Sequence, residues 1–206
     1  TKTYDGNANL ALSTQNFLLG NFAPGTSQGG TISQTNGVFN SQNVASANLV
    51  TASLTAANLS VTGDTLASNY VLPTSVFKAG MITAKALTVS GIVANGKDYD
   101  GNTTATLSNQ GAVATGIVGE VLTVSTTGSF NDQNAGARKV NTTTTIANNG
   151  STLASNYSLS NATNAVDATI AQKAVTVAGI VANGKTYDGN ATATLSNQGA
   201  VATGIV

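Results

Sequence analysis

The sequence predicts an all-β protein made of small β-sandwich-like modules, Ig-like or β-grasp-like in topology, that follow one another end to end. Residues 88–118 recur as residues 176–206 with only three differences, and self-similarity at a fixed period indicates a modular array. Runs rich in Thr and Val also alternate polar with apolar residues, and Asn-Gly or Asp-Gly pairs separate them. This combination is typical of short strands joined by tight turns.

The copies carry the same motifs in the same order. A Lys-x-Tyr-Asp-Gly-Asn motif opens each copy, at residues 2–7, 97–102 and 185–190. An apolar segment, predicted to be a strand, closes the two longer copies at residues 82–89 and 170–177. These limits predict a first module at 1–90, a second at 91–179 and an incomplete third at 180–206.

Two further motifs lie inside each long copy. A Gly-x-Phe-Asn-x-Gln-Asn segment occupies residues 37–43 and 128–134, and Thr-Leu-Ala-Ser-Asn-Tyr occupies residues 65–70 and 152–157. The period-two series Val140, Thr142, Thr144 and Ile146 predicts a half-buried strand.

Turn chemistry favours type I′ hairpin turns, because Asn, Asp and Gly tolerate the positive φ that both central positions require. The pairs are Asn36-Gly37, Asn95-Gly96, Asp100-Gly101, Asn149-Gly150, Asn183-Gly184 and Asp188-Gly189.

Charge and composition exclude several function classes. Eight basic and eight acidic residues give a formal net charge of zero, which argues against nucleic acid or an anionic membrane surface as a partner. Cys and His are both absent, so disulfides, thiolate sites and imidazole metal sites are impossible. No apolar run approaches the roughly 20 residues that span a bilayer. Because the chain lacks a starting Met and a leader, we expect it to be a piece of a longer polypeptide.

The aromatic residues are few and fall in the repeated motifs. Tyr4, Tyr99 and Tyr187 belong to the Tyr-Asp-Gly motif, with Gly101 and Gly189 among its glycines; Tyr70 and Tyr157 follow Asn69 and Asn156; Phe39 and Phe130 lie in the Gly-x-Phe segment. We expect these side chains to anchor a thin core, with each tyrosine hydroxyl bonded to nearby backbone. The alternative is an exposed aromatic platform for a ligand.

Calcium is the one cofactor that the motifs suggest. Asp5, Asp100 and Asp188 each precede an Asn by two residues, as with Asn102 and Asn190, which resembles the start of a calcium loop. The pattern stops after two ligands, so an Asp-Gly turn stabilised by its own side chain is the favoured interpretation. We therefore expect no cofactor and keep calcium as the alternative.

Lysines near the asparagine motif raise a second chemical alternative. Lys85 and Lys173 lie in the closing segments, and an isopeptide bond to Asn69 or Asn156 would crosslink a module. Such a bond also needs a buried carboxylate, and Glu120 is the only glutamate. Lysines that protect a strand edge are the favoured interpretation.

Catalysis is not expected. Without histidine, no serine or threonine has the usual activating base, and no phosphate-binding loop or paired carboxylates occur. We predict that the chain is not an enzyme.

The ordered motifs resemble the YDG/MBG-type repeats of large bacterial surface proteins, including filamentous-haemagglutinin-like adhesins. The matching residues are Lys97, Tyr99, Asp100, Gly101, Phe130, Asn134, Gly136, Asn156 and Tyr157, and again Lys185, Tyr187, Asp188 and Gly189. The first copy departs from the pattern, with Val44-Ala45-Ser46 where a Gly is expected.

The resemblance implies a stalk or spacer repeat of a secreted or cell-surface adhesin that supports adhesion or biofilm contact. It implies an extracellular location and neighbouring repeats as the main partners. Two alternatives are a module that binds host or matrix glycan or protein, and a filament subunit that pairs its strands with other copies of itself.

Overall fold

The computed structural model describes residues 1–201, and these residues form an all-β protein with 46% of the chain in strands and no closed barrel. The prediction of an all-β fold is therefore confirmed. Residues 202–206 of the predicted third module lie outside the described residues. The helices of the described part are three-residue 3-10 turns: η1 (Thr14–Asn16), η2 (Ala56–Asn58), η3 (Ala67–Asn69) and η4 (Ala154–Asn156). Within residues 1–201, none has the length and hydropathy to cross a membrane.

The chain divides into two compact units that are discontinuous in sequence. Unit 1 comprises Thr1–Val89, Val113–Val124 and Thr145–Ala162. Unit 2 comprises Ser90–Ala112, Ser125–Thr144 and Thr163–Val206. Unit 1 thus combines the first sequence copy with two stretches of the second copy.

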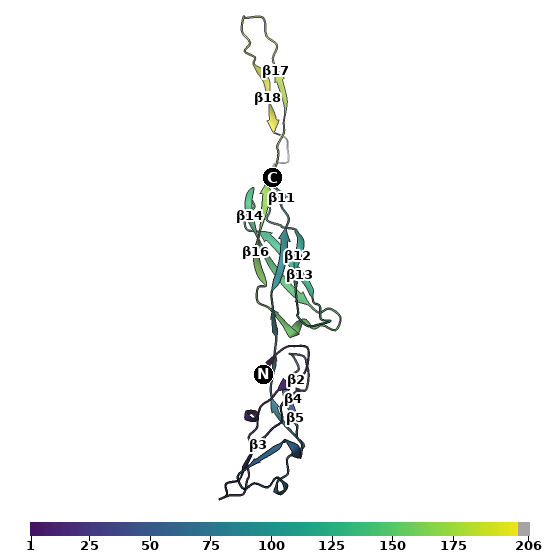
Figure 1. Cartoon of the computed structure of the whole chain (residues 1–206). Helices are drawn as coiled ribbons and strands as arrows, with labels where there is room; N and C mark the ends of the chain where they lie inside the picture. The colour runs from purple at the N-terminus through teal and green to yellow at the C-terminus, as the bar shows by residue number, and fades with distance from the viewer. Residues whose placement is uncertain (202–206) are drawn as a thin grey trace. The chain divides into compact units, whose positions relative to one another are not determined.

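Unit 1 is built on an antiparallel sheet in the order β2-β4-β5-β7 (Figure 1). Its strands are β2 (Asn9–Ala11), β4 (Asn36–Phe39), β5 (Leu49–Ser53) and β7 (Ser75–Ala79). A second antiparallel pair joins β3 (Gly29–Ile32) to β6 (Leu59–Thr62). Two parallel pairs complete the unit: β1 (Lys2–Thr3) with β8 (Ile82–Thr83), and β9 (Lys85–Leu87) with β15 (Tyr157–Leu159).

The core of unit 1 draws buried side chains from both sequence copies. Its buried members are Tyr4, Phe39, Ala47, Ile82, Leu87, Leu122 and Tyr157. Leu122 and Tyr157 belong to the second copy and the other five to the first. Burial of apolar surface at about 25 cal/mol per Å² is the main force that stabilises such a core.

Unit 2 is built on a mixed sheet in the order β11-β16-β14-β13. Its strands are β11 (Lys97–Asp98), β16 (Thr163–Ala171), β14 (Gly136–Ala147) and β13 (Thr123–Phe130). Two hairpins accompany it: β10 (Val89–Ala94) with β12 (Leu107–Val113), and β17 (Val177–Ala182) with β18 (Leu195–Val201). Figure 1 shows β17 and β18 as a two-stranded ribbon.

The predicted alternation of β14 is confirmed, and it buries hydroxyl groups. Val140, Thr142 and Thr144 are buried, at 0%, 2% and 2% exposure, while the intervening residues are exposed. The Thr126 hydroxyl donates to the Gln110 carbonyl oxygen at 2.6 Å and accepts from the Thr144 hydroxyl at 2.9 Å. Because each hydroxyl has a partner, a threonine-rich core avoids the cost of an unsatisfied buried polar group.

The predicted type I′ turns are wrong. Among residues 1–201, the only residue other than glycine with positive φ is Asn21, so no Asn or Asp of the predicted pairs has the required conformation. In Asp100-Gly101, the aspartate carboxylate accepts the Asn102 N–H at 3.2 Å, and only Gly101 takes positive φ, at 75°. Asn36-Gly37 lies inside β4 and makes no turn.

The predicted continuous closing strands are also corrected. Residues 82–89 are divided between β8, β9 and the start of β10, because β8 pairs with β1 whereas β9 pairs with β15. In the second copy, β16 ends at Ala171 and β17 begins at Val177. A change of partner along the chain therefore breaks what the sequence presents as one apolar run.

Candidate functional site

Two tyrosines from different sequence copies meet in the core of unit 1. The N–H of Tyr4 donates to the Thr83 carbonyl oxygen at 2.8 Å, which extends the β1–β8 pairing and fixes the tyrosine backbone. Tyr4 and Tyr157 are 3% and 5% exposed, and their rings meet edge to face with centroids 5.3 Å apart at 80°. This geometry is the favoured one for aromatic pairs.

Glu120 joins the two hydroxyls. The Tyr4 hydroxyl donates to Glu120 Oε1 at 2.7 Å and the Tyr157 hydroxyl donates to Glu120 Oε2 at 2.5 Å. We call these three residues the Tyr–Glu–Tyr cluster. The sequence had suggested that the hydroxyls bond to backbone; in this cluster they bond to a carboxylate, and bonds to an ionised acceptor are roughly twice as strong as neutral ones.

A short turn presents Glu120 to the tyrosines. The buried Thr115 hydroxyl donates to the Glu120 carbonyl oxygen at 2.8 Å, and the Glu120 N–H donates to the Ile117 carbonyl oxygen at 3.2 Å. On the facing side, a Cβ built on Gly6 would lie 3.0 Å from Ile117 Cγ2 and 3.5 Å from Glu120 Oε1. Gly6, with φ of 84°, therefore allows the turn of the second copy to approach the Tyr-Asp-Gly motif of the first.

Asn156 adds a second contact between the copies within unit 1. Its side chain is 1% exposed, its Oδ1 accepts the Val44 N–H at 2.9 Å, and its Nδ2 donates to Asn43 Oδ1 at 3.0 Å. The amide is thus engaged with the segment in which the first copy departs from the repeat pattern. This geometry argues against an isopeptide bond at Asn156.

The cluster perturbs both phenols. Burial, followed by the hydrogen bond and negative charge of Glu120, raises the pKa of Tyr4 from 10.0 to about 12. The same causes, in the same order, raise the pKa of Tyr157. The raised pKa values keep both tyrosines protonated, as hydrogen-bond donors to Glu120, above the pH at which an ordinary tyrosine ionises.

The Tyr-Asp-Gly motif itself forms the same local network in every copy. Lys97 Nζ contacts Asp100 Oδ1 at 2.6 Å, and Lys185 Nζ contacts Asp188 Oδ1 at 2.6 Å. The adjacent lysine lowers the pKa of each of these aspartates. The calcium candidates Asp100 and Asp188, together with Asp5, are therefore paired with an ammonium group, and this argues against calcium at these positions.

Asn102 and Asn190 take part in the same network. Each accepts the lysine ammonium on its side-chain oxygen at 2.9 Å. Among residues 1–201, no group of three or more potential acidic ligands converges on one point.

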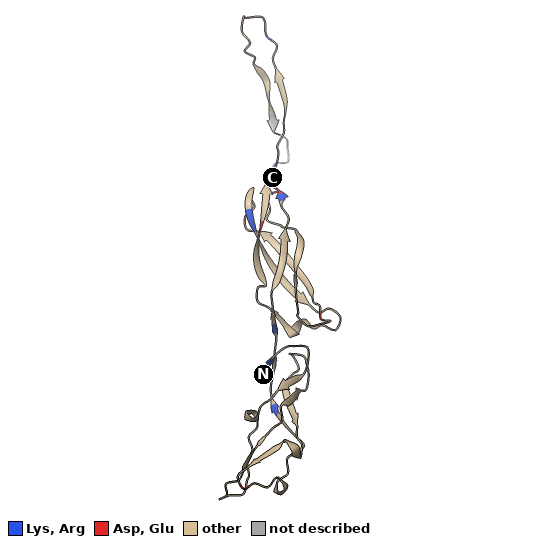
Figure 2. Cartoon of the chain, viewed as in Figure 1, with Lys and Arg blue, Asp and Glu red and all other residues tan. Residues whose placement is uncertain are grey.

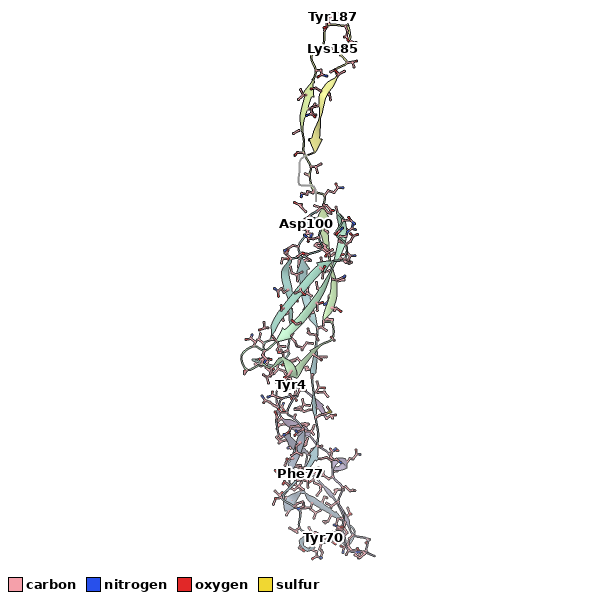
Figure 3. All side chains as sticks on the ribbon, turned by 180° about the vertical axis from the view of Figure 1, so that it is seen from behind. Tyr4, Tyr70, Phe77, Asp100, Lys185 and Tyr187 are labelled. Atoms are coloured by element: carbon pink, nitrogen blue, oxygen red, sulfur yellow. The ribbon has the colours of Figure 1, made fainter. Side chains whose placement is uncertain are left out.

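The remaining motif residues occupy varied environments. Phe39 and Phe130 are buried, each at 3% exposure, and Tyr99 packs half-buried against the unit 2 cluster of Phe130, Val140 and Ile170. Tyr187 is 93% exposed, contrary to the expected burial, and lies in the loop that joins β17 to β18 (Figure 3). The difference in burial between Tyr187 and Tyr4 follows from strand pairing. The two residues before Tyr4 pair with β8, whereas within residues 1–201 no strand pairs with the equivalent residues 185–186.

Tyr70 lies toward the opposite end of unit 1 from Tyr4 (Figure 3). Its hydroxyl donates to Gln28 Oε1 and accepts the Ala23 N–H at 3.2 Å. The neighbouring Asn69 is exposed, unlike its counterpart Asn156.

Sequence reasoning missed Glu120 as a site residue. Its rarity was the available signal: a single glutamate in 206 residues is conspicuous. Its partners Tyr4 and Tyr157 lie 116 and 37 residues away, so no local spacing connected the three.

Unit 1 also contains an apolar cavity of about 430 Å³. It is lined by Leu12, Phe17, Leu19, Ile32, Leu54 and Phe77, among other residues. Lys78 is the one charged side chain in its described lining.

Lys, Arg, Asp and Glu are sparse along the described part of the ribbon (Figure 2). The eight basic and eight acidic residues cancel. Six of these sixteen charged residues form the three Lys–Asp ion pairs of the Tyr-Asp-Gly motifs. The chain therefore has little positive charge with which to neutralise phosphates.

Comparison with known families gives one match. Residues 83–165 match a YDG domain. The match covers 83 of the 206 residues, and the name YDG is known for a domain that binds methylated DNA in eukaryotes. No curated protein and no solved structure matches the chain.

This match corrects the identification made from the sequence. The YDG name and the β-rich fold agree with it, but the match assigns no adhesin repeat. The expected roles as an adhesin spacer, in cell-surface adhesion or in biofilm contact, and the secreted character that went with them, are therefore withdrawn.

Proposed function

We propose that the chain is a non-enzymatic structural protein of tandem β modules in which a later YDG copy completes the folded unit of the copy before it. The observation that carries this proposal is the Tyr–Glu–Tyr cluster. Tyr4 comes from the first copy, whereas Glu120 and Tyr157 come from the second. Both tyrosines lie in the core of unit 1, and the half-buried Glu120 joins them.

The contacts around the cluster support the same role. Leu122 is 6% exposed in this core, and the amide of Asn156 binds the Asn43–Val44 segment. Buried hydrogen-bonded side chains fix one mutual arrangement of the segments that they join, because any other arrangement leaves polar groups unsatisfied. The natural partner of each copy is accordingly the neighbouring copy.

DNA binding, the activity attached to the YDG name elsewhere, is not favoured for this chain. Proteins that bind DNA present clustered Lys and Arg that neutralise several phosphates. Here the net charge is zero, and Lys2, Lys97 and Lys185 are each paired with an aspartate.

A double-mutant cycle in the full chain tests the proposed function. Tyr4→Phe and Glu120→Gln should each lower the free energy of unfolding by about 1–3 kcal/mol, because each removes a charge-assisted bond in the core. The double variant should lose less than the sum, with a coupling of about 0.5–3 kcal/mol. Denaturant unfolding followed by circular dichroism measures all four proteins.

The control cycle pairs Tyr4→Phe with Lys139→Gln. Lys139 forms an exposed ion pair with Asp167 at 2.7 Å in unit 2, so these two changes should be additive. Additivity in the Tyr4–Glu120 cycle as well would contradict the proposal.

A further inference from the structure

The two ends of unit 1 have the same local architecture but different side chains at two positions. At one end, the Val121 N–H donates to Thr152 Oγ1 at 3.3 Å; at the other, the Gly29 N–H donates to Thr65 Oγ1 at 2.8 Å. Thr152 and Thr65 each begin a Thr-Leu-Ala-Ser-Asn-Tyr motif that continues into a 3-10 turn. This register makes Gln28 the counterpart of Glu120, and Tyr70 the counterpart of Tyr157.

Tyr70 binds Gln28 in the same way as Tyr157 binds Glu120. Its hydroxyl donates to Gln28 Oε1, as the Tyr157 hydroxyl donates to Glu120 Oε2. The second aromatic ring is also present. Phe22 meets Tyr70 edge to face with centroids 5.1 Å apart at 64°, compared with 5.3 Å and 80° for Tyr4 and Tyr157.

The source of the second ring differs between the ends. Tyr4 comes from the Tyr-Asp-Gly motif of one copy and packs on Tyr157 of the next copy. Phe22 and Tyr70 both belong to the first copy. At the Tyr70 end, Phe22 takes the place that Tyr4 of another copy takes at the Tyr157 end. Phe22 lies in residues 20–28, which we call the cap segment.

The exchange of two residues is chemically consistent. A glutamate carboxylate offers two acceptor oxygens, one for each of two phenol hydroxyls, whereas a glutamine amide offers a single acceptor oxygen. Phe22 has no hydroxyl and needs no acceptor. Tyr with Glu and Phe with Gln are therefore matched pairs, because two phenols facing Gln would have to share one neutral oxygen instead of each binding its own carboxylate oxygen.

The cap segment is anchored to the unit by its own contacts. Ser27 Oγ donates to Asp64 Oδ2 at 2.7 Å, and the Thr26 hydroxyl donates to the Ala23 carbonyl oxygen at 2.7 Å. The Ala23 N–H, next to Phe22, donates to the Tyr70 hydroxyl at 3.2 Å. The same segment thus supplies both the ring and a hydrogen bond to Tyr70.

We propose that Phe22 and Gln28 form a built-in cap at the Tyr70 end of unit 1. This cap prevents the Tyr-Asp-Gly tyrosine of another copy from packing on Tyr70. The identity of residue 28 decides which ring the end accepts: Glu selects a tyrosine from a neighbouring copy, and Gln selects the phenylalanine of its own cap segment. This inference rests on the proposed function, because it assumes that copies couple through the Tyr–Glu–Tyr cluster.

Chemical rescue in the full chain tests the selectivity. Phe22→Ala removes the ring, and toluene or p-cresol then serves as a free phenylalanine or tyrosine side chain. The preference for p-cresol over toluene should be about 10- to 100-fold greater in Phe22→Ala/Gln28→Glu than in Phe22→Ala, since one charge-assisted hydrogen bond is added. Shifts of the Tyr70 ring signals in NMR spectra give the dissociation constants.

Two results of the rescue would overturn the cap. Equal preference in the two variants would show that residue 28 does not select the ring. Failure of toluene to bind Phe22→Ala would show that Phe22 does not fill a site at Tyr70. If either occurs while Tyr4 and Glu120 remain coupled in their double-mutant cycle, the cap is wrong and the proposed function stands.

Self-association tests the closure directly. The Tyr187 hydroxyl is displayed on a loop in which the tyrosine is 93% exposed, so each chain carries a Tyr-Asp-Gly tyrosine that another chain can reach. The mean mass of Phe22→Ala/Gln28→Glu should rise with protein concentration in sedimentation experiments, and adding Tyr187→Phe should reverse the rise. If Phe22→Ala/Gln28→Glu keeps the mass of the wild-type chain at every concentration, the cap does not block association.

Discussion

Glu120 accepts hydrogen bonds from two buried tyrosine hydroxyls, and this arrangement couples stability to alkaline pH. The folded-state pKa of Tyr4 is about 12, above its ordinary 10.0. As the pH rises above 10.0, the unfolded chain loses a phenol proton that the folded chain keeps. The stabilisation is therefore fully present below pH 10.0 and is lost as the pH rises through about 12.

Glu120→Gln should weaken this effect. With the carboxylate removed, the pKa of Tyr4 should fall from about 12 but stay above 10.0, because burial, the larger cause, remains. Absorbance of tyrosinate during an alkaline titration measures the change. Asp167→Asn, which removes a carboxylate that is 83% exposed in unit 2, should leave the titration unaltered. An unchanged curve for Glu120→Gln would refute the role of the carboxylate.

The Tyr-Asp-Gly motif shows how much one short sequence determines locally. The Lys185–Asp188–Asn190 network repeats the distances of the Lys97–Asp100–Asn102 network although Tyr187 is exposed and Tyr99 is half-buried. The turn is therefore encoded by the motif itself. Its tyrosine is buried only where strands of the same unit lie against it.

At the scale of the strand, the Gly-x-Phe segment has a packing explanation. Residues two apart in a strand point to the same face, so Gly128 and Phe130 share one face of β13. A Cβ on Gly128 would lie 2.8 Å from Val140 Cγ1, and one on Gly37 would lie 2.9 Å from Val50 Cγ1. The glycine in both copies leaves room for a valine of the neighbouring strand.

Gly128→Ala should therefore destabilise the protein by about 1–3 kcal/mol, because the added methyl group overpacks a closed core. Thermal unfolding followed by circular dichroism measures the loss. Gly184→Ala is the matched control, since no atom lies within 4 Å of its added Cβ and its φ is not positive. Equal stability of the two variants would count against the packing explanation.

The sequence predicted elements well where the pattern was local. Alternation of polar and apolar residues identified both β14 and the all-β class. The single apolar run at 82–89 was misread because its division into β8 and β9 depends on two distant partners, β1 and β15. The turns were misread because the aspartate side chain, rather than a second positive φ, completes them.

The candidate site was beyond local prediction for a similar reason. The motifs located Tyr4 and Tyr157, but the residue that joins them is a glutamate outside every repeated motif. Repeat alignment assigned each tyrosine to the core of its own copy. In the folded chain, Tyr157 lies in unit 1 with the first copy, because a parallel pairing of β15 with β9 places it there.

Over the whole chain, unit 1 is built in part from the second copy. Val113–Val124 and Thr145–Ala162 belong to this unit, and they supply Leu122, Glu120 and Tyr157 to its core and cluster. The first copy should then be stable only to the extent that these stretches remain in place. Extracellular location, predicted from the sequence, stays a prediction.

Hydrogen exchange in the full chain tests this dependence most directly, through the adjacent residues Leu122, which is 6% exposed, and Val121, which is 62% exposed. The amides of Tyr4 and Phe39 in the first copy donate to the Thr83 and Ala8 carbonyl oxygens. Leu122→Asp should speed their exchange by roughly 100-fold, because a buried charge destabilises the fold by about 3 kcal/mol or more. Val121→Asp should leave both amides near wild-type rates. Wild-type exchange of Tyr4 and Phe39 in Leu122→Asp would contradict the claim that the second copy completes the fold of the first.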